Sequence, residues 1–385
     1  MKILFINQVV GPLFSELLFA KSNNFTELSV ICGSGGELVK KYGARTIAAP
    51  AYQKTSITKR VLSWISFSFF VFRFIWRDGR SYDLILFSTN GPLNTVSIAF
   101  LHFFRRINNF EYMVYDIYPE VIFQRWPLSK YVIFPLMIFR LIDSYVIKNS
   151  KQVFTLSNGM SETIKKRSEI AYTQDLTVLP VVASAPQIDD SVEISRQKVE
   201  LIIGEKLNNL VLVYSGNLGF QHDLTNLIKA IIKPDFCNDI SLIICGDGEL
   251  LNEYLQISFG SKNIKFLPFQ EKSQFDALLN CADISIVSLG GGFGSILMPS
   301  KFATYISFGL PVILIGDEKS ELGELINNNQ IGWTLSASKL KKIDQLLFSL
   351  INDDAAIPSR TKVTEYFYNF HTTKFLRKVL NEKNK

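Results

Sequence analysis

The sequence is poor in the residues that build metal centres and disulfide frameworks. It has three histidines and four cysteines among 385 residues, and no two cysteines are spaced as CxxC. The cysteines lie mostly in apolar runs, which is typical of buried free thiols in a reducing cytoplasm. The acidic pair Asp353-Asp354 lies in a polar stretch with no buried strand before it, so it makes a poor metal site. We therefore expect no metal and no cofactor.

Signals for export and for dinucleotide binding are also missing. The segment Met1–Ile6 is too short an apolar run for a signal peptide, and no small-residue cleavage site follows it. It predicts a first β-strand instead. The glycines of Gly33–Gly36 are too loosely placed for a dinucleotide fingerprint, because no G-x-G-x-x-G follows the first strand.

The apolar runs are too short to cross a bilayer. Val61–Trp76 has 16 residues, whereas a membrane-spanning helix needs about 20. It is rich in aromatic residues and has basic residues at both ends, and Phe100–Arg106 and Tyr131–Arg140 repeat this chemistry. Such segments are typical of helices that lie in the membrane interface. Buried helices of an N-terminal domain are the alternative.

Positive charge is concentrated in the first half of the chain. Residues 1–175 contain 21 Lys and Arg against 12 Asp and Glu, whereas the remainder contains 20 against 23. A basic half favours an anionic membrane surface, a phosphate or a nucleic acid as partner, and solvated lysines are the plain alternative. Nucleic acid is the weakest of these interpretations, because the aromatic residues cluster in apolar helices instead of alternating with basic ones. We expect no nucleic-acid partner.

What the sequence does contain is an alternation of short apolar runs and helical patterns. At 385 residues and 47% hydrophobic, the chain is long enough for two globular domains. Between Val211 and Gly332 the apolar runs end in glycine-rich turns, Gly216–Gly219, Gly246–Gly248 and Gly290–Gly294. The pattern predicts an α/β fold with a doubly wound parallel sheet, whose ligands bind at the carboxyl ends of the strands. The glycines therefore indicate a nucleotide-type site.

Five segments of this region resemble family 4 glycosyltransferases. They are SGNLG at 215–219, ICGDGE at 244–249, CADISIVSL at 281–289, MPSKFATYISFGLPVI at 298–313 and IGWTL at 331–335. None is specific alone, but their order and spacing are similar to the sugar-nucleotide domain of that family over roughly 210–335. The resemblance is strongest to the bacterial branch that builds O-antigen, capsule and exopolysaccharide on a lipid carrier.

The resemblance implies the GT-B fold, in which two Rossmann-like doubly wound parallel-sheet domains face a cleft. Residues 1–185 would form a membrane-facing, acceptor-binding domain and 186–358 a nucleotide-sugar-binding domain. Residues 359–385 would form a C-terminal helix that packs back on the first domain, and Gln174–Pro186 would link the two domains.

The resemblance also implies an activity and a location. The expected enzyme is a retaining, metal-independent glycosyltransferase that moves a hexosyl or N-acetylhexosaminyl group from a nucleotide-sugar, most often a UDP-sugar in this branch. The expected acceptor is a polyprenyl-diphosphate-linked saccharide. Such an enzyme would be cytoplasmic and peripherally attached to the inner face of the plasma membrane.

A nucleotide-sugar donor needs a site that stabilises negative charge on its β-phosphate. Backbone amides, a helix N-terminus or a cation supply this stabilisation. Two segments fit the need: Gly216–Gly219, and Ser300-Lys301 at the start of an expected helix. The expected donor-site residues are Gly216, Asn217, Leu218, Gly219, Gly246, Asp247, Phe269, Gly292, Phe293, Gly294, Ser300, Lys301, Thr304 and Glu321.

In the first half, the segment VYDIYPE at 114–120 brings acidic residues to the carboxyl end of a strand. Acidic residues there contact a sugar hydroxyl or act on it as a base, and the segment resembles the D-x-x-P-E element of the lipid-carrier branch. We expect Asp116 to be the main catalytic contact and Glu120 the second, with a helix cap as the alternative for Asp116. Gly11 is expected in the acceptor-side loop. Lys165–Arg167 is expected on a solvated face or a phosphate patch.

The sequence departs from the commonest pattern of the family. The two glutamates before the Gly-x-Pro turn are replaced by Ile296 and Thr304, and the usual arginine after the strand-end glycine by Asn217. The usual lysine is absent near His222, which is either a phosphate contact or a structural residue. We therefore assign to Lys301 the catalytic electrostatic role that an arginine and a lysine normally share.

The missing glutamates leave two alternatives open. One is a catalytically silent GT-B partner of a polysaccharide-assembly complex. The other is a GT-B sugar-nucleotide 2-epimerase, which would need more acidic and histidine residues in the cleft than the sequence provides.

Overall fold

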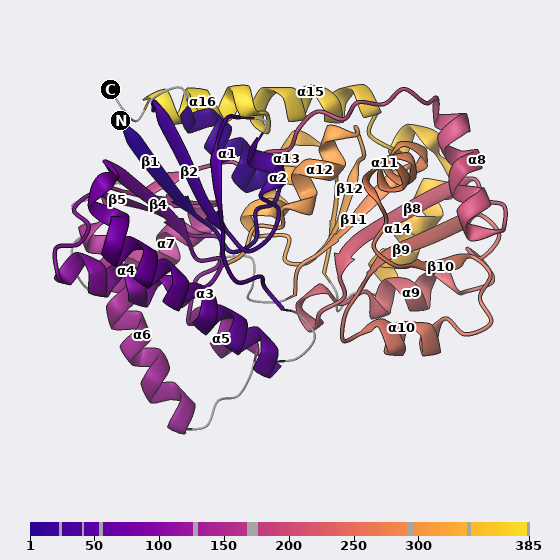
Figure 1. Ribbon diagram of the computed structural model, residues 1–385. Coiled ribbons are helices and arrows are strands. Elements are labelled where there is room, and N and C mark those ends of the chain that lie inside the picture. The colour runs from indigo at the N-terminus through magenta and orange to yellow at the C-terminus, as the bar shows by residue number, and fades with distance from the viewer. Residues whose placement is uncertain are drawn as a thin grey trace. The chain divides into compact units, whose positions relative to one another are not determined.

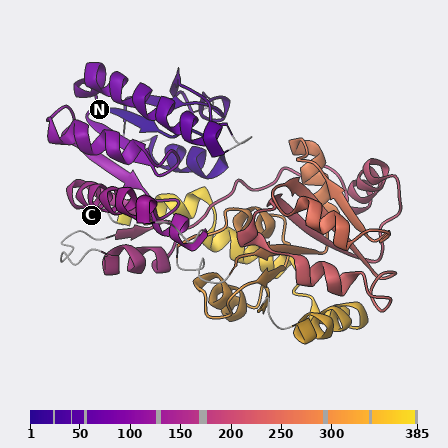
Figure 2. The ribbon, with the colours of Figure 1, turned by 90° about the horizontal axis from the view of Figure 1, so that it is seen from below.

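The computed structural model describes residues 1–22, 25–40, 42–53, 57–125, 130–167, 176–290, 296–336 and 340–382. The chain divides into two compact units. Unit 1 consists of Met1–Val182, Ser295–Met298 and Thr373–Lys385, and unit 2 of Ala183–Gly294 and Pro299–Thr372. Each unit has a parallel sheet with helices on both faces (Figures 1 and 2). The prediction of two Rossmann-like α/β domains is confirmed.

Within the described residues, the sheet of unit 1 has its strands paired in parallel in the order β3-β2-β1-β4-β5-β6-β7. The strands are β1 (Lys2–Ile6), β2 (Glu27–Cys32), β3 (Arg45–Ala48), β4 (Leu84–Ser88), β5 (Phe110–Met113), β6 (Gln152–Thr155) and β7 (Leu176–Val178). The central strands β1 and β4 are buried along almost their whole length. Helices cover both faces of a parallel sheet, which is why these strands read as continuous apolar runs.

The edge strand β7 corrects one expectation. It lies in the stretch Gln174–Pro186, which the sequence predicted as a linker between domains. The structure pairs Leu176–Val178 with β6, in the register Val153 to Leu176. Three residues are too few to show the alternation that predicts a strand, so the sequence gave no signal for it.

The helices of unit 1 follow from the spacing of its apolar residues. In α3 the buried residues Phe67, Val71 and Ile75 recur every four positions and face the sheet. The helices are α1 (Pro12–Ser22), α2 (Glu37–Lys40), α3 (Ile57–Asp78), α4 (Asn94–Phe103), α5 (Glu120–Arg125), α6 (Lys130–Asn149), α7 (Asn158–Arg167) and α16 (Thr373–Glu382).

Unit 2 repeats the strand order of unit 1. Its described strands pair in parallel in the order β10-β9-β8-β11-β12-β13. They are β8 (Leu210–Asn217), β9 (Ile240–Asp247), β10 (Ile264–Leu267), β11 (Ile284–Ser288), β12 (Val312–Ile315) and β13 (Gly332–Leu335). In both sheets the first strand lies inside the sheet and the direction of winding reverses beside it, as in doubly wound folds.

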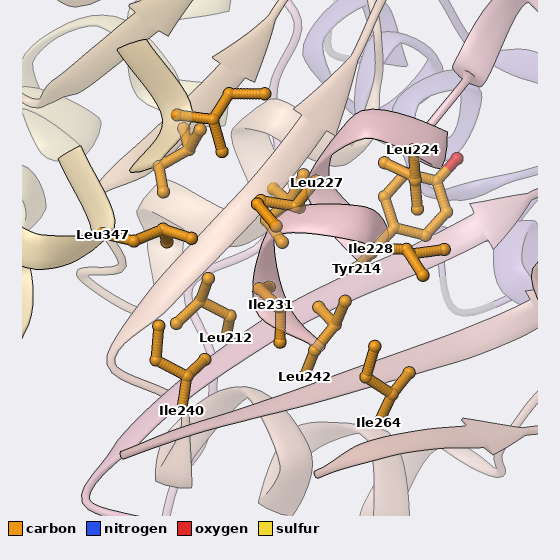
Figure 3. Packing of buried hydrophobic residues seen from close by; sticks show 14 of the residues in the cluster. Leu212, Tyr214, Leu224, Leu227, Ile228, Ile231, Ile240, Leu242, Ile264 and Leu347 are labelled. Atoms are coloured by element: carbon orange, nitrogen blue, oxygen red, sulfur yellow. The ribbon is translucent and has the colours of Figure 1, made fainter. Parts of the chain in front are cut away.

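One face of the unit 2 sheet carries a core built by alternate residues of its strands. Leu210, Leu212 and Tyr214 of β8 point to this face, where they meet Leu227 and Ile231 of α9 (Figure 3). The helices of unit 2 are α8 (Val192–Ile203), α9 (Thr225–Ile231), α10 (Leu251–Ile257), α11 (Lys272–Cys281), α12 (Lys301–Ser307), α13 (Glu321–Asn329), α14 (Leu340–Asn352) and α15 (Arg360–Phe370).

The C-terminal tail forms two helices instead of the single one expected. The first, α15, belongs to unit 2, where it packs against α12. The second, α16, belongs to unit 1 and packs against α1, in agreement with the predicted return of the chain to its first domain. Arg377 fixes this contact because its Nη2 atom donates to the Phe19 carbonyl at 3.3 Å and its guanidinium lies 4.0 Å from the Phe19 ring centroid.

Candidate functional site

The predicted site residues gather where each sheet changes its direction of winding. This change falls between β1 and β4 in unit 1 and between β8 and β11 in unit 2. Loops leave the carboxyl ends of such strand pairs in opposite directions, which makes room for a ligand. Most predicted donor residues follow β8, β9 and β11, whereas Phe269 follows β10 and Glu321 follows β12; the predicted acceptor-side residues follow β1 and β5.

Lys301 begins α12 and holds its ammonium group at the carboxyl end of β8. The Nζ atom lies 4.0 Å from the ring centroid of Tyr214. It is buried and has no hydrogen-bond partner among the described residues. Burial lowers the pKa of Lys301 to about 7, because a charged amine loses hydration there. The aromatic face compensates part of that loss, and an anion would compensate the rest.

Two tyrosines that the sequence analysis did not single out hold this lysine in place. The Tyr214 hydroxyl donates to the Asn217 carbonyl at 2.8 Å, which fixes the ring under the ammonium group. The Tyr305 hydroxyl, on α12, accepts from the Ser215 backbone N–H at 2.7 Å. α12 is thereby tied to the end of β8. The only signal in the sequence was a tyrosine in an otherwise aliphatic strand.

Glycine is required where β8 and β9 end. Gly216 has a φ of 121°, and a Cβ atom there would lie 3.0 Å from the Lys301 Nζ atom. Gly246, its register partner on β9, has a φ of 157°, and a Cβ atom there would lie 1.9 Å from the Gly216 carbonyl oxygen. A side chain at Gly216 would meet the ammonium group of Lys301, and one at Gly246 would collide with the backbone of Gly216.

β8 continues further than the sequence predicted. Gly216 and Asn217 were expected in a turn, but they pair with Gly246 and Asp247 as the last residues of the strand. Leu218 is buried, and its N–H donates to the Asp247 carbonyl at 2.9 Å. Strand pairing therefore leaves only Leu218 and Gly219 for the turn before the short helix at Phe220–His222.

His222 has a structural contact. Its Nδ1 atom lies 2.6 Å from the Ser288 carbonyl oxygen, which only accepts, so Nδ1 carries the proton. Burial, together with the charge of Lys301, lowers the pKa of His222 to about 4. The ring is therefore neutral at physiological pH and connects the loop after β8 to the end of β11.

The remaining predicted donor residues are spread around this point. Asp247 is exposed, and its carboxylate accepts from the Gly248 N–H at 2.8 Å. Phe269 is 62% exposed. Ser300 is exposed, and its side chain does not cap α12. Thr304 and Glu321 are half-buried on α12 and α13. Because α12 has only seven residues, the charge of Lys301 and not the helix supplies the positive end of the site.

The glycine-rich turn after β11 cannot be placed in this arrangement. Gly292, Phe293 and Gly294 lie outside the described residues. Their expected contact with the donor stays a prediction.

In unit 1, Asp116 follows β5 and its backbone is held by Thr89. The Thr89 Oγ1 atom accepts from the N–H groups of Tyr115 and Asp116 at 2.9 and 3.1 Å. No hydrogen bond or ion pair of the Asp116 carboxyl group occurs among the described residues. Burial raises the pKa of this carboxyl group to about 6, which is the range of a general base near neutral pH.

Glu120 differs from Asp116 because both of its carboxylate oxygens are engaged. Oε2 lies 3.1 Å from Nη1 of Arg167, and Oε1 lies 3.8 Å from Nε of Arg140. Arg167 also pairs with Asp143 on α6. The expectation that Lys165–Arg167 is a solvated or phosphate-binding face is wrong for Arg167, whose side chain is 1% exposed. Its buried carboxylates come from elements distant in sequence, so the sequence gave no sign of them.

Two buried amides beside Gly91, in the loop after β4, were also missed. Gln8 follows β1, Asn94 begins α4, and both are fully buried. Gln8 donates to the Ser63 carbonyl at 2.9 Å, but its Oε1 atom and both amide atoms of Asn94 are buried without partners in the described part of the chain. Such atoms are costly unless a water molecule or a ligand binds them. The signal for Gln8 was a polar amide close to the end of an apolar strand, since β1 ends at Ile6.

Gly11, expected in the acceptor-side loop, directly precedes α1. Nothing lies within 4 Å of the position that a Cβ atom would occupy there. The fold therefore does not require glycine at this position, and its role stays a prediction.

Three neighbouring helices of unit 1, α3, α4 and α6, expose a large apolar surface, which we call the apolar face. α4 packs against both α3 and α6. The exposed residues of the apolar face are Val61, Leu62, Ile65, Phe69, Trp76, Val96, Phe100, Phe103, Ile133, Phe134, Met137, Ile138 and Leu141. No helix in the described residues is both long enough and apolar enough to span a membrane.

Basic residues border the apolar face at the ends of α3 and α4. Arg73, Arg77, Arg80 and Arg105 are exposed there. The guanidinium of Arg106 lies 4.0 Å from the Trp76 ring centroid. Aromatic side chains and arginines beside an apolar surface are the combination found in interfacial helices.

No metal site emerges in the part of the chain that the structure describes. It holds no group of three or more histidine, cysteine, aspartate or glutamate side chains that could bind an ion. The role of Lys301 at a phosphate stays a prediction.

A known protein family matches the part of the chain that contains Lys301. Residues 195–370 match the family model "Glycosyl transferases group 1". The matched segment is less than half of the chain and contains β8 to β13 and Lys301. The enzyme class expected from the sequence, a glycosyltransferase, is confirmed at the level of this domain.

Two relatives are named as glycosyltransferases. WcaI of Escherichia coli (strain K12), named as a colanic acid biosynthesis glycosyl transferase, is 30% identical over 122 residues, which cover 31% of this chain and 29% of WcaI. WbjE of Pseudomonas aeruginosa, named as a glycosyltransferase, is 22% identical over 294 residues, or 74% of this chain and 70% of WbjE. The matched stretch thus spans less than a third of the first relative.

Solved structures agree with the fold. WaaG, a glycosyltransferase involved in lipopolysaccharide biosynthesis, superposes with a TM-score of 0.68 over 98% of both chains, at 14% identity. The UDP-GlcNAc 2-epimerase from Neisseria meningitidis superposes with a TM-score of 0.53 over 99% of this chain and 100% of its own, at 13% identity. The prediction of a GT-B architecture is confirmed.

Proposed function

We propose that the protein transfers a sugar from a nucleotide-sugar, a UDP-sugar, to a lipid-linked saccharide during synthesis of a bacterial surface polysaccharide. The observation that supports this most is the buried Lys301 ammonium group. It lies in the glycosyl transferase group 1 domain, at the point where the sheet changes its direction of winding, and no described anion neutralises it. A nucleoside diphosphate would supply the negative charge that would neutralise this ammonium group.

Each unit would contribute one half of the chemistry. In unit 2, Lys301 would stabilise the charge that develops on the β-phosphate as the sugar leaves, which is where a preorganised cation lowers the barrier most. In unit 1, Asp116 would bind the acceptor or the transferred sugar. We infer retention of configuration, with the leaving phosphate accepting the acceptor proton on the same face of the sugar.

The apolar face supports a lipid-linked acceptor. A polyprenyl chain stays in the bilayer, so an enzyme that uses it must work at the membrane surface. We propose that α3, α4 and α6 lie in the interface of the cytoplasmic leaflet, with the exposed arginines at the lipid phosphates. The domain division at residues 185 and 358 and the donor role of the 186–358 segment remain part of this proposal.

Calorimetric titration of the full chain with UDP, GDP and ADP tests the donor site. We expect selective binding of UDP, and a loss of affinity of about tenfold to 100-fold in Lys301→Ala, because hydrogen bonds to charged groups contribute about 1.5–3 kcal/mol. Lys262→Ala, which removes an exposed lysine of the same unit, is the matched control and should bind as the wild type does.

Transfer itself is then tested with UDP-sugars and a synthetic undecaprenyl-diphosphate-linked N-acetylglucosamine. Formation of a larger lipid-linked saccharide supports the proposal. A folded protein that binds no nucleotide would favour a catalytically silent partner of an assembly complex. Conversion of UDP-N-acetylglucosamine to its 2-epimer without any acceptor would favour the epimerase.

A further inference from the structure

We propose that Arg167 is a positioning residue for the transfer reaction, and that it clamps the loop carrying Asp116 against α6 and α7. The inference rests on the proposed function in one respect, the participation of Asp116 in transfer. It also gives Glu120 a holding role in place of the catalytic one expected from the sequence.

The contacts of Arg167 reach both the backbone and the side chains of this loop. Its Nη1 atom donates to the Tyr118 carbonyl at 2.8 Å and to Glu120 Oε2 at 3.1 Å. Its Nη2 atom donates to Asp143 on α6. The loop between Asp116 and Glu120 is therefore fixed at its far end by Arg167, while Thr89 fixes its near end.

Further contacts make the clamp stiff. The Tyr112 hydroxyl, on β5, donates to Asp143 Oδ1 at 2.7 Å and lies 3.2 Å from Thr95 Oγ1. Arg140, one turn before Asp143 on α6, approaches the other oxygen of Glu120 at 3.8 Å. Residues of β5, α4, α5, α6 and α7 thus meet in one network around the loop.

Stability alone is a weak reason for such a network. Burying an arginine and two carboxylates costs desolvation energy, and well-packed apolar side chains of similar size often give equal or greater stability. What the ions add is a defined geometry, because the planar guanidinium fixes the direction of several hydrogen bonds at once. The network therefore fits a site that needs one exact loop position.

The same contacts separate the roles of the two acidic residues. Both oxygens of Glu120 face arginines, Oε2 at 3.1 Å and Oε1 at 3.8 Å, so a sugar hydroxyl that bound Glu120 would compete with the ion pairs that hold the loop. The carboxyl group of Asp116 has no hydrogen bond or ion pair in the described residues, and it is kept in its half-buried position by backbone contacts on both sides. Among the described contacts, Glu120 is thus committed to ion pairs that hold the loop and the carboxyl group of Asp116 is not.

The test compares Arg167→Lys with the wild type in the full chain. Lysine keeps the charge but cannot bind the carbonyl and both carboxylates together. With UDP-glucose, UDP-galactose and UDP-N-acetylglucosamine as donors and undecaprenyl-diphosphate-linked N-acetylglucosamine as acceptor, we expect kcat to fall about 100-fold, the cost of a displacement near 1 Å. The affinity for UDP should stay within about twofold, since Lys301 is unchanged.

Two readouts distinguish positioning from general damage. Hydrogen exchange of the backbone amides at 114–121 should accelerate in Arg167→Lys, and the acidic limb of the kcat/KM profile should move down toward the ordinary carboxyl range as water reaches Asp116. Arg360→Lys is the matched control. It alters another largely buried arginine that donates to carbonyls, including that of Asn280 at 3.0 Å in unit 2, and it should change neither readout.

Asp143→Asn provides a second, milder variant if Arg167→Lys does not fold, because it keeps the shape of the side chain and leaves Arg167 its contacts with the loop. It should shift the same two readouts by a smaller amount. The inference is overturned if the wild type transfers sugar and Arg167→Lys keeps its kcat, pH profile and loop exchange. If the wild type binds no nucleotide, the proposed function fails, whereas loop exchange still tests the clamp.

Discussion

At the scale of single residues, the lowered pKa of Lys301 makes the affinity for a nucleotide depend on pH. Its pKa is lowered to about 7 by burial, so in the empty site the ammonium group loses its proton as the pH rises above 7. A diphosphate favours the charged form, and binding above pH 7 must therefore take up a proton.

We expect the affinity for UDP to fall between pH 7 and 9. We also expect the heat of binding at pH 8 to differ between phosphate and Tris buffers, because the proton taken up comes from the buffer. Lys301→Arg keeps its charge throughout this range and is the control, so its binding heat should not depend on the buffer. Equal heats for the wild type in both buffers would show that Lys301 is charged before UDP arrives.

The lowered pKa of Lys301 also makes the free energy of unfolding depend on pH. The unfolded chain has an ordinary lysine pKa of 10.5 and so binds more protons than the folded chain between pH 7 and that value. The contribution of Lys301 therefore raises the free energy of unfolding as the pH rises through this window and disfavours folding most below pH 7. We expect Lys301→Met to increase the free energy of unfolding by about 1 kcal/mol at pH 6, and less at pH 9. Urea titrations at both pH values measure this, and a less stable variant at pH 6 would contradict it.

Residue roles were only partly predictable from the sequence. Lys301 and Gly216 stood out because a lysine at a helix start and a glycine at a strand end have local reasons to be near a phosphate. Tyr214, Gln8 and Arg167 did not stand out, because their importance comes from contacts that join distant segments. Arg167 follows two lysines on the same helix and looked like one more solvated charge, although the fold buries it against α6.

At the scale of elements, the apolar residues of α3, α4 and α6 are the feature that the sequence predicted most directly. Each helix has one set of apolar residues that faces the sheet and a second set that stays exposed on the apolar face. A helix of a water-facing domain normally shows only the first set.

We expect Phe103→Ser and Phe134→Ser each to weaken binding of the protein to anionic phospholipid vesicles about tenfold, since burying most of a phenylalanine is favourable by about 1.5–3 kcal/mol. Both side chains are 70% exposed, so neither change should affect folding. Phe259→Ser is the matched control, because Phe259 is 93% exposed on unit 2, and it should leave binding unchanged. Vesicle co-sedimentation gives the answer, and an equal loss in all three variants would argue against a specific membrane face.

Elements were easier to predict than residue roles because periodicity reports burial directly. The central strands β1, β4, β8 and β11 were recognised from apolar runs. The short edge strand β7 was not, and neither was the break between α15 and α16. Edge strands and helix breaks depend on pairing and packing partners that a local pattern does not contain.

At the scale of the whole molecule, the uneven distribution of charge predicts how the protein responds to salt. Residues 1–175 carry the excess of basic residues and the rest of the chain a small excess of acidic ones. An anionic surface should therefore attract the first part and repel the second, and salt should weaken the attraction by screening it.

We expect binding to vesicles with anionic lipid to fall about tenfold between 50 and 300 mM NaCl. Binding to neutral vesicles, which depends on the apolar face, should change little. Flotation of the full chain with both kinds of vesicle at the two salt concentrations provides the measurement. Binding that is independent of lipid charge would show that the basic residues are merely solvated.

The two-unit architecture was predictable because it rests on patterns repeated along the chain. Each unit has the same strand order, and each brings its glycine and polar residues to the carboxyl edge of its own sheet. The substrate, in contrast, depends on a few side chains, and these are where the sequence departs from its family.

The unneutralised cation beside Tyr214 also bears on turnover. When a nucleotide-sugar gives up its sugar, the β-phosphate loses its ester bond to the sugar, keeps its anhydride bond to the α-phosphate and gains one ionisable oxygen. A site that recognises its ligand through a single buried ammonium group will then hold the spent nucleotide more firmly than the fresh donor. We expect UDP to be a competitive inhibitor with an inhibition constant below the KM of the donor, and progress curves to stay linear for longer when a phosphatase removes it. Release of the nucleotide, and not transfer of the sugar, would then be the rate-limiting step.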